Sequence, residues 1–399
     1  MTERDEAQSI ELLLCGGHVI DPANGIDGIA DVAIGGGRIV AVGRDLPTDG
    51  VDRVFGVAGR YVAPGIIDMH VHVFHPHQRS GLSLHPLVNT FSSGVTTVVD
   101  AGTAGWRDFA DFKTEVIDQS KVRLFGYVNI VGRGMGGDWE HDIREMHPGM
   151  AAAVAGAFPG VVVGIKTAHY WAKQPPDADH PLWAAADGAV AAGEQCGLPV
   201  MVDFYPWIPG RSYQELILER MRPGDIHTHV FAQQFPIIDE QGKVEEHLWK
   251  ARERGIVFDV GHGAASFWFR NAVPAIEQGF VPDSISTDLH TGNVNGVVID
   301  MLTTMNKILA AGVPLADVIA KSTVAPAKEI GHPELGTLTP GSEADVAVLA
   351  LDEGEFAFVD CGRTTLKGGH RLRCQLTLRA GETVWNPDGL GLPGWDAAS

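Results

Sequence analysis

The stretch Ile66-Ile-Asp-Met-His-Val-His72 decides the fold. It is a short apolar run that closes with two histidines, and similar runs recur through the middle of the chain. Runs of about six to eight residues that are rich in β-branched side chains are typical of strands buried on both faces of a parallel sheet. Eight such runs predict strands, at residues 66–72, 95–100, 123–130, 161–166, 199–204, 225–231, 256–261 and 284–290.

Amphipathic stretches between these runs predict helices, for example at residues 106–120, 183–195, 244–254 and 298–311. Gly255 and Gly312 follow two of the stretches, where a glycine commonly ends a helix. Eight strand–helix units over about 270 residues indicate an α/β fold of the (β/α)8 TIM-barrel type. A doubly wound open sheet is the alternative, but no glycine fingerprint followed by an acidic residue supports its dinucleotide site.

The two ends of the chain follow a different pattern. Residues 11–45 and 345–384 alternate short apolar segments with glycine turns. Two β-rich ends that flank a barrel would pair most simply as one small β-sandwich. We therefore expect residues 1–62 and 340–399 to form the sandwich together, and residues 63–339 to form the barrel.

The composition of the chain argues against several classes of partner and of structure. The 399 residues include 30 Lys+Arg and 50 Asp+Glu, which gives a net charge of −20 and argues against nucleic acid or an anionic membrane as partner. The acidic N-terminus does not resemble a signal peptide, and no apolar stretch is long enough to span a membrane. The four cysteines, at residues 15, 196, 361 and 374, lie far apart except for the last two, which indicates neither a zinc knuckle nor a disulfide framework. We expect a cytoplasmic protein.

Nearly every predicted strand ends in a residue that can bind a metal or move a proton. These residues are His70, His72, Asp100, Lys166, Asp203, His227, His229, His262, Asp288 and His290. The carboxyl ends of barrel strands open onto one mouth, so these side chains would meet there. Because buried charges are costly unless they are paired or coordinated, the convergence indicates a bound cation.

His70 and His72 are a significant pair because they end the first predicted strand of the barrel. Alternation along a strand places both on one face, where they can reach the same ion. The pair His75/His77 lies beyond the strand, and we interpret it as part of a loop.

Two other residues allow two interpretations each. Lys166 closes the run Val161-Val-Val-Gly-Ile-Lys166, where it would either extend to solvent from the barrel end or lose its proton through burial and react with CO2 to form a carbamate. Asp288 would be a helix cap or, at the end of the last strand, a metal ligand and general base. We favour the second interpretation of Asp288.

A series of motifs along the chain resembles, in its order, the motifs of the amidohydrolase superfamily. The resemblance is closest to the dihydroorotase-like amidohydrolase and deacetylase group, which is related to dihydroorotases, hydantoinases and D-aminoacylases. The motifs are the segments 62–72, 94–102, 164–166, 224–231, 261–263, 285–290 and 336–349. The resemblance covers nearly the whole chain.

The resemblance implies a centre of two divalent metal ions, usually zinc. One ion would be held by His70, His72, Asp288 and a CO2-derived carbamate on Lys166. The second would be held by Lys166, His229 and the fifth-strand residue. The family usually has a histidine at this last position, and this chain has Asp203, which can also ligate zinc.

The implied reaction is hydrolysis of an amide-type C–N bond, in an N-acyl compound or a cyclic amide, with Asp288 as general acid and base. We expect four residues to contact the small-molecule substrate, namely His169, Tyr170, His262 and His290. Relatives often carry an arginine near His169, so this substrate would be different or less anionic. Members of the superfamily are often homo-oligomers.

Three alternatives stay open at this stage. The same centre would also cleave an ester or a lactone, as an ester deacetylase or lactonase. A single-metal deaminase of the superfamily would not need Lys166. The third alternative is a binding or regulatory protein, in which the change to Asp203 has abolished catalysis.

Overall fold

The structure is a computed structural model, and it describes residues 9–75, 81–169, 180–205 and 209–396. No helix within these ranges has the length and apolar character needed to cross a membrane.

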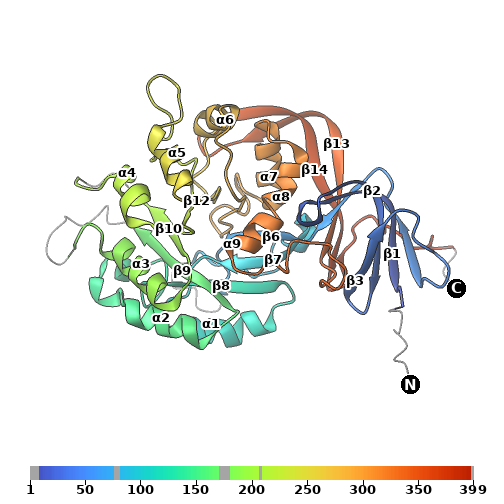
Figure 1. Ribbon diagram of the computed structural model, residues 1–399, viewed down its shortest axis with the longest axis horizontal. Coiled ribbons are helices and arrows are strands. Elements are labelled where there is room, and N and C mark those ends of the chain that lie inside the picture. The colour runs from blue at the N-terminus through green and yellow to red at the C-terminus, as the bar shows by residue number, and fades with distance from the viewer. Residues whose placement is uncertain (1–8, 76–80, 170–179, 206–208, 397–399) are drawn as a thin grey trace.

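A seven-stranded parallel sheet forms the centre of the molecule (Figure 1). Its strands neighbour one another in chain order, so each pairs with the strand that follows it in sequence. They are β6 (Ile66–Val71), β7 (Val95–Asp100), β8 (Arg123–Asn129), β9 (Val162–His169), β10 (Val200–Phe204), β11 (Ile226–His227) and β12 (Val257–Phe258). Seven of the eight predicted strands are therefore confirmed.

The eighth predicted strand, at residues 284–290, is irregular. It makes two isolated parallel bridges, from Ser284 to Asp259 beyond β12 and from Leu289 to Val71 of β6. Asp288 has a φ of 51°, a left-handed conformation that interrupts an extended backbone. The segment thus lies between the two edge strands of the sheet without forming a regular strand.

Apolar side chains bury both faces of this sheet, as its sequence pattern predicts. Met69, Val99 and Met201 belong to an inner cluster, whereas Val98 and Val202 belong to the large cluster that includes the helices. The helices are α1 (Phe109–Glu115), α2 (Pro148–Ala157), α3 (Ala184–Cys196), α4 (Tyr213–Glu215), α5 (Glu246–Glu253), α6 (Phe269–Glu277), α7 (Met301–Ala310), α8 (Leu315–Ala320) and α9 (Val324–Glu329).

The four example helices are present as α1, α3, α5 and α7; α3 is shifted by one residue from its predicted range, and the other three are shorter than predicted. Gly255 and Gly312 follow α5 and α7 with φ of 92° and 103°. Because side chains other than glycine rarely adopt such angles, these two residues end the helices as expected.

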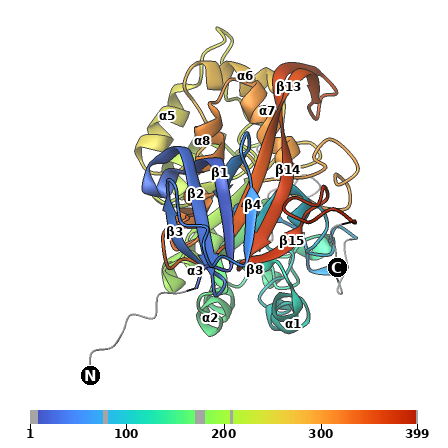
Figure 2. The same cartoon turned by 90° about the vertical axis from the view of Figure 1, so that its right-hand side faces the viewer.

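A second sheet of eight strands combines the two ends of the chain (Figure 2). The strands are β1 (Leu12–Asp21), β2 (Ile26–Gly35), β3 (Arg38–Gly43), β4 (Arg53–Gly56), β5 (Tyr61–Pro64), β13 (Val346–Val359), β14 (Thr365–Arg379) and β15 (Glu382–Trp385). The antiparallel pair β5–β13 joins the N-terminal strands to the C-terminal ones, and the pairs β1–β4 and β1–β5 are parallel.

A buried ionic cluster connects the two sheets. Arg123 of β8 donates to Asp345 at 2.5 Å and to Glu343 at 2.5 Å. Arg379 of β14 also donates to both carboxylates. The side chain of Asp345 is only 11% exposed, so it must neutralise two arginines where water screens them poorly.

We expect Asp345→Ala to lower the free energy of unfolding by roughly 3 kcal/mol, because it leaves two largely buried arginines short of a partner. Asp352→Ala is the control, since Asp352 also pairs with two arginines, Arg371 and Arg373, which are about half exposed. Exposed pairs contribute about 0–1 kcal/mol. Thermal and denaturant unfolding measure both effects, and equal losses in the two variants would contradict this account of the cluster.

Candidate metal centre

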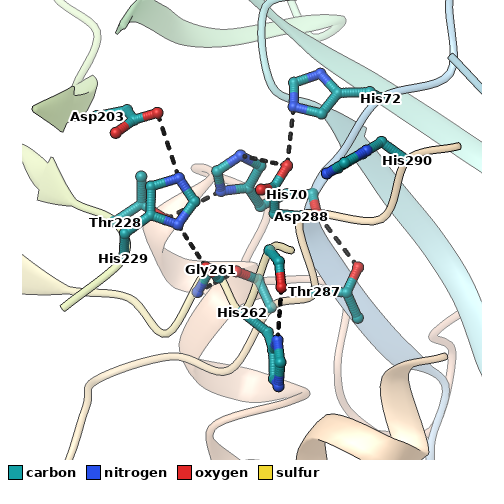
Figure 3. A network of polar contacts seen from close by, with 12 residues as sticks. His70, His72, Asp203, Thr228, His229, Gly261, His262, Thr287, Asp288 and His290 are labelled. Carbon is teal, nitrogen blue, oxygen red and sulfur yellow. Dashed lines mark hydrogen bonds and ion pairs between the residues drawn. The ribbon is translucent and has the colours of Figure 1, made fainter. Parts of the chain in front are cut away.

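His70 of β6, His72 directly after β6 and Asp288 of the irregular eighth segment bring three potential metal ligands together (Figure 3). One ligand atom each from His70, His72 and Asp288 lie within 4.8 Å of one another. Asp288 Oδ1 is 3.0 Å from His72 Nε2 and 3.5 Å from His70 Nε2. Both imidazoles are buried, so the cluster lies inside the protein.

A hydroxyl fixes the orientation of His70. The Thr228 hydroxyl donates to Asp259 Oδ2 at 2.8 Å, so its oxygen accepts the hydrogen bond from His70 Nδ1 at 3.0 Å. Burial and the nearby cations hold the pKa of His70 well below its usual value, so the ring is neutral. Its single proton is therefore on Nδ1, and Nε2 presents a lone pair to Asp288.

His72 is held by a matching arrangement. Its Nδ1 lies 2.7 Å from the Thr103 hydroxyl. The backbone N–H of Thr103 donates to Asp100 Oδ1 at 2.7 Å, and its hydroxyl contacts the same carboxylate. In both arrangements a carboxylate and a threonine hold Nδ1, so that Nε2 faces the cluster. Such partners orient metal-bound histidines in proteins.

The donor set at the centre fits a metal ion. Asp288 is ionised, because the hydrogen bond and charge of His72 and the charge of His229 lower its pKa more than burial raises it. A carboxylate and the lone pair of His70 Nε2 repel each other unless a cation or a proton lies between them. Two imidazole nitrogens and one carboxylate oxygen are ligands that zinc and similar ions prefer.

Lys166 of β9 lies against this cluster. Its side chain is fully buried, and Nζ is 3.5 Å from His70 Nε2. Burial lowers the pKa of Lys166, although the Asp203 and Asp288 carboxylates oppose this shift. Gly102 makes room for the lysine stem, because a Cβ on Gly102 would lie 2.6 Å from Lys166 Cβ. The interpretation of Lys166 as a side chain that extends to solvent is thus wrong.

His229 and Asp203 form a second group of potential ligands beside the first. His229 Nε2 is 3.3 Å from Asp203 Oδ2, and the rings of His229 and His70 are 5.2 Å apart. Burial alone would lower the pKa of His229, but the Asp203 carboxylate raises it to about 9. His229 Nδ1 donates to the carbonyl of Gly261 at 2.5 Å, which leaves Nε2 directed at Asp203.

Two side chains of the centre come from residues with a strained backbone conformation. His229 and Asp288 both have a left-handed φ, of 63° and 51°. Non-glycine residues keep such angles where surrounding contacts hold them. Asp68 supplies one set of contacts, because its carboxylate accepts bonds from the Thr287 backbone N–H at 3.0 Å and the Thr287 hydroxyl at 2.6 Å.

A cavity of about 240 Å³ opens onto the centre. Its described lining residues are His70, His72, Leu82, Met135, Gly136, Glu140, Asp203, His229, Asp288 and His290. A hollow of about 790 Å³ lies elsewhere, at the amino ends of β9 to β12, away from the histidine cluster. The smaller cavity is the one in which a substrate would meet the metal ligands.

The four predicted substrate contacts differ in where they lie. His290 lines the cavity, and its ring is 6.3 Å from that of His72. His262 is fully buried and its ring points away from the other histidines (Figure 3). His169 ends β9, but its side chain and Tyr170 lie outside the described residues.

Several residues that contact the potential ligands were not predicted from the sequence. Asp259 carried a signal, since it is an acidic residue inside the apolar run 256–261. Thr103 and Thr228 carried none, because a threonine near a strand end has many other uses. Glu140 was also missed; it lies in the cavity wall, and burial raises its pKa to about 7.

Comparison with known proteins connects this geometry to a family. The sequence pattern described as the amidohydrolase family matches residues 269–372. A deacetylase from Enterococcus faecalis is 31% identical over 381 residues, which are 94% of this chain and 99% of that protein. A deacetylase from Brucella anthropi is 33% identical over 353 residues, which are 84% and 82% of the two chains.

Solved structures agree with the sequences. A structure described as an adenine deaminase has a TM-score of 0.84 at 29% identity and covers 94% of this chain and all of that one. A dihydroorotase has a TM-score of 0.79 at 28% identity, with 94% and 99% covered. With relatives that match along nearly its whole length, the chain belongs to the amidohydrolase superfamily, whose enzymes hydrolyse carbon–nitrogen bonds and generally use divalent metal ions.

Proposed function

We propose that the protein is a binuclear metal-dependent amidohydrolase that removes an acyl group, such as acetyl, from the nitrogen of a small molecule. The observation that carries this proposal is the convergence of His70, His72 and Asp288 beside the buried Lys166. Deacetylase relatives that match most of the chain support the acyl substrate.

The proposal includes a ligand set. His70, His72 and Asp288 would hold one divalent ion, usually zinc in proteins with such ligands. Asp203 and His229 would hold a second ion, and Lys166 would bridge the two as a carbamate. Burial favours this modification, because only the neutral amine of a lysine reacts with CO2.

When bound, the ions supply Lewis acidity toward the substrate carbonyl and lower the pKa of water. Asp288 is the residue placed to take the proton of that water, since it is ionised and lines the cavity. It would then return the proton to the leaving nitrogen. His290 and Glu140 border the same cavity and would contact the substrate. His169 and Tyr170 remain the other proposed substrate contacts, whereas the ring of His262 points away from the other histidines.

The proposal also covers the architecture. The bridges of residues 284 and 289 to both edges of the parallel sheet support a closed (β/α)8 barrel over residues 63–339. The strands that residues 1–62 and 340–399 share in one sheet support a second domain built from both ends, which we expect to be a sandwich. We further propose a cytoplasmic enzyme that assembles as a homo-oligomer.

An ester deacetylase or lactonase is the second candidate. The name deacetylase, shared by the two relatives, does not specify the atom that carries the acetyl group. A matched pair of N-acetyl and O-acetyl compounds with the same carbon skeleton distinguishes the two activities.

We expect purified protein to contain two divalent ions per chain, and a chelator to abolish hydrolysis of N-acyl substrates until zinc or manganese is restored. Elemental analysis and an amidase assay measure the two effects. One ion per chain would instead indicate the single-metal deaminase type of site. Protein that binds no metal and hydrolyses nothing would support a binding or regulatory role.

Replacing Asp288 by Asn should lower kcat by about 10²–10⁴-fold, because the amide cannot take the proton of water. Metal content should stay near that of the wild type, since the amide oxygen can still coordinate. Asp283→Asn, at the opposite end of the barrel, is the control and should keep its activity. Full turnover by Asp288→Asn would rule out the proton-transfer role.

Asp203 decides whether the second ion is held. We expect Asp203→Ala to bind one ion fewer per chain, and Asp203→His to keep two, because imidazole and carboxylate both ligate zinc. Elemental analysis counts the ions, and kcat on one N-acyl substrate shows which ligand suits the reaction. If Asp203→Ala retains both ions, Asp203 is not a ligand.

A further inference from the structure

The tripeptide Gly261–Gly263 touches two residues of the metal centre. The Gly261 carbonyl accepts the bond from His229 Nδ1 at 2.5 Å. Gly263 lies against Asp288, because a Cβ on Gly263 would be 2.7 Å from Asp288 Oδ2. A small displacement of this tripeptide would therefore move both His229 and Asp288.

The side chain of His262 fixes the tripeptide from behind. Its Nδ1 is 2.9 Å from the carbonyl oxygen of Gly263, and its ring stacks on Phe267 with centroids 4.7 Å apart. A carbonyl only accepts, so Nδ1 carries the proton. Burial and the charge of Lys307 hold the pKa of His262 well below its usual value, which leaves Nε2 as an acceptor.

Lys307 completes the arrangement from helix α7. Its Nζ donates to His262 Nε2 at 2.7 Å and to the Val297 carbonyl at 2.5 Å, and the residue is only 1% exposed. His262 follows β12, whereas Val297 belongs to the segment that follows His290. One buried ammonium group thus joins two loops that border the metal centre.

We infer that Lys307, acting through His262, is a positioning residue for the metal centre. It holds Gly261 and Gly263 so that His229 and Asp288 keep their orientation. This inference rests on the proposed function, because it assigns a task to residues that surround the proposed ions. It also gives His262 a supporting role in place of the direct substrate contact that its sequence position suggested.

The buried contacts explain why a lysine is needed. Without its ammonium group, the buried His262 Nε2 and the partly buried Val297 carbonyl would both lose their donor. The two loops would then shift until water or another donor reached them. Groups that contact a metal ligand directly, as the Gly261 carbonyl contacts His229, change metal affinity or activity by about 10–100-fold when they are lost, and Lys307 acts on this carbonyl through His262.

Lys307→Met tests the inference, with Lys321→Met as the control. Lys321 is partly buried, and burial lowers its pKa as it does that of Lys307, but Lys321 follows helix α8 near Asp283 and Asp317, away from the centre. The readouts are kcat and KM on an N-acyl substrate, the visible absorption of the cobalt(II)-substituted protein, and the melting temperature.

We expect Lys307→Met to lower kcat by about 10–100-fold with little change in KM, and to alter the cobalt absorption. Lys321→Met should match the wild type in both. A drop in melting temperature with unchanged kcat and cobalt absorption would show a purely structural role for Lys307 and overturn the inference.

Two substitutions of His262 keep the test decisive if Lys307→Met does not fold. His262→Gln retains an oxygen that Lys307 can reach, and His262→Leu does not. We expect Gln to preserve the cobalt spectrum and most of kcat, and Leu to reproduce the expected defect of Lys307→Met. Equal behaviour of the Gln and Leu variants would contradict the inference.

The same measurements separate this inference from the proposed function. Wild-type protein that binds no cobalt and hydrolyses no acyl substrate would overturn the proposed function and the inference with it. Normal cobalt binding and hydrolysis in the wild type, with unaffected Lys307 and His262 variants, would overturn the inference alone.

Discussion

The structure depends on a close approach of groups that repel one another. The carboxylate of Asp288 lies 3.5 Å from the lone pair of His70 Nε2, inside the protein. In water each group would be solvated separately, but here the fold holds them together. A bound cation would remove this repulsion. Its binding free energy would also be more favourable, because side chains that are already assembled need no further ordering when the ion binds.

The arrangement is stable because polar contacts behind the ligands replace lost hydration. Burial raises the pKa of Asp259, and the bonds that it accepts from Thr228, Ser284 and Ser286 oppose this shift. It lies behind His70 without entering the cavity. Asp100 has the equivalent place behind His72, where it also accepts the Val73 backbone N–H at 2.8 Å. Residues in loops after several strands thus supply the hydrogen bonds that offset the desolvation free energy of the buried centre.

The sequence predicts those parts of the site that strand geometry alone determines. His70 of β6 and His72 directly after it share a face because side chains alternate along extended backbone, and Lys166 points inward because β9 is a regular strand. His229 and Asp288 have left-handed backbones, which no periodic pattern reveals. For the same reason the eighth strand was expected to be regular. The inward or outward direction of His262 depends on Lys307, 45 residues further along the chain, and a local pattern cannot contain that contact.

The pair of Asp203 and His229 shows how charge and metal binding compete at the second position. Asp203 raises the pKa of His229 to about 9, so in the metal-free protein the two form an ion pair at neutral pH. A group with a raised pKa stabilises the fold most below its unfolded value, near 6.5, and this contribution is lost as the pH rises through 9. A metal ion must displace the same proton, so its advantage over the ion pair grows with pH. If Asp203 and His229 hold the second of the proposed ions, its binding would therefore depend more on pH than binding at His70, whose ring is already neutral.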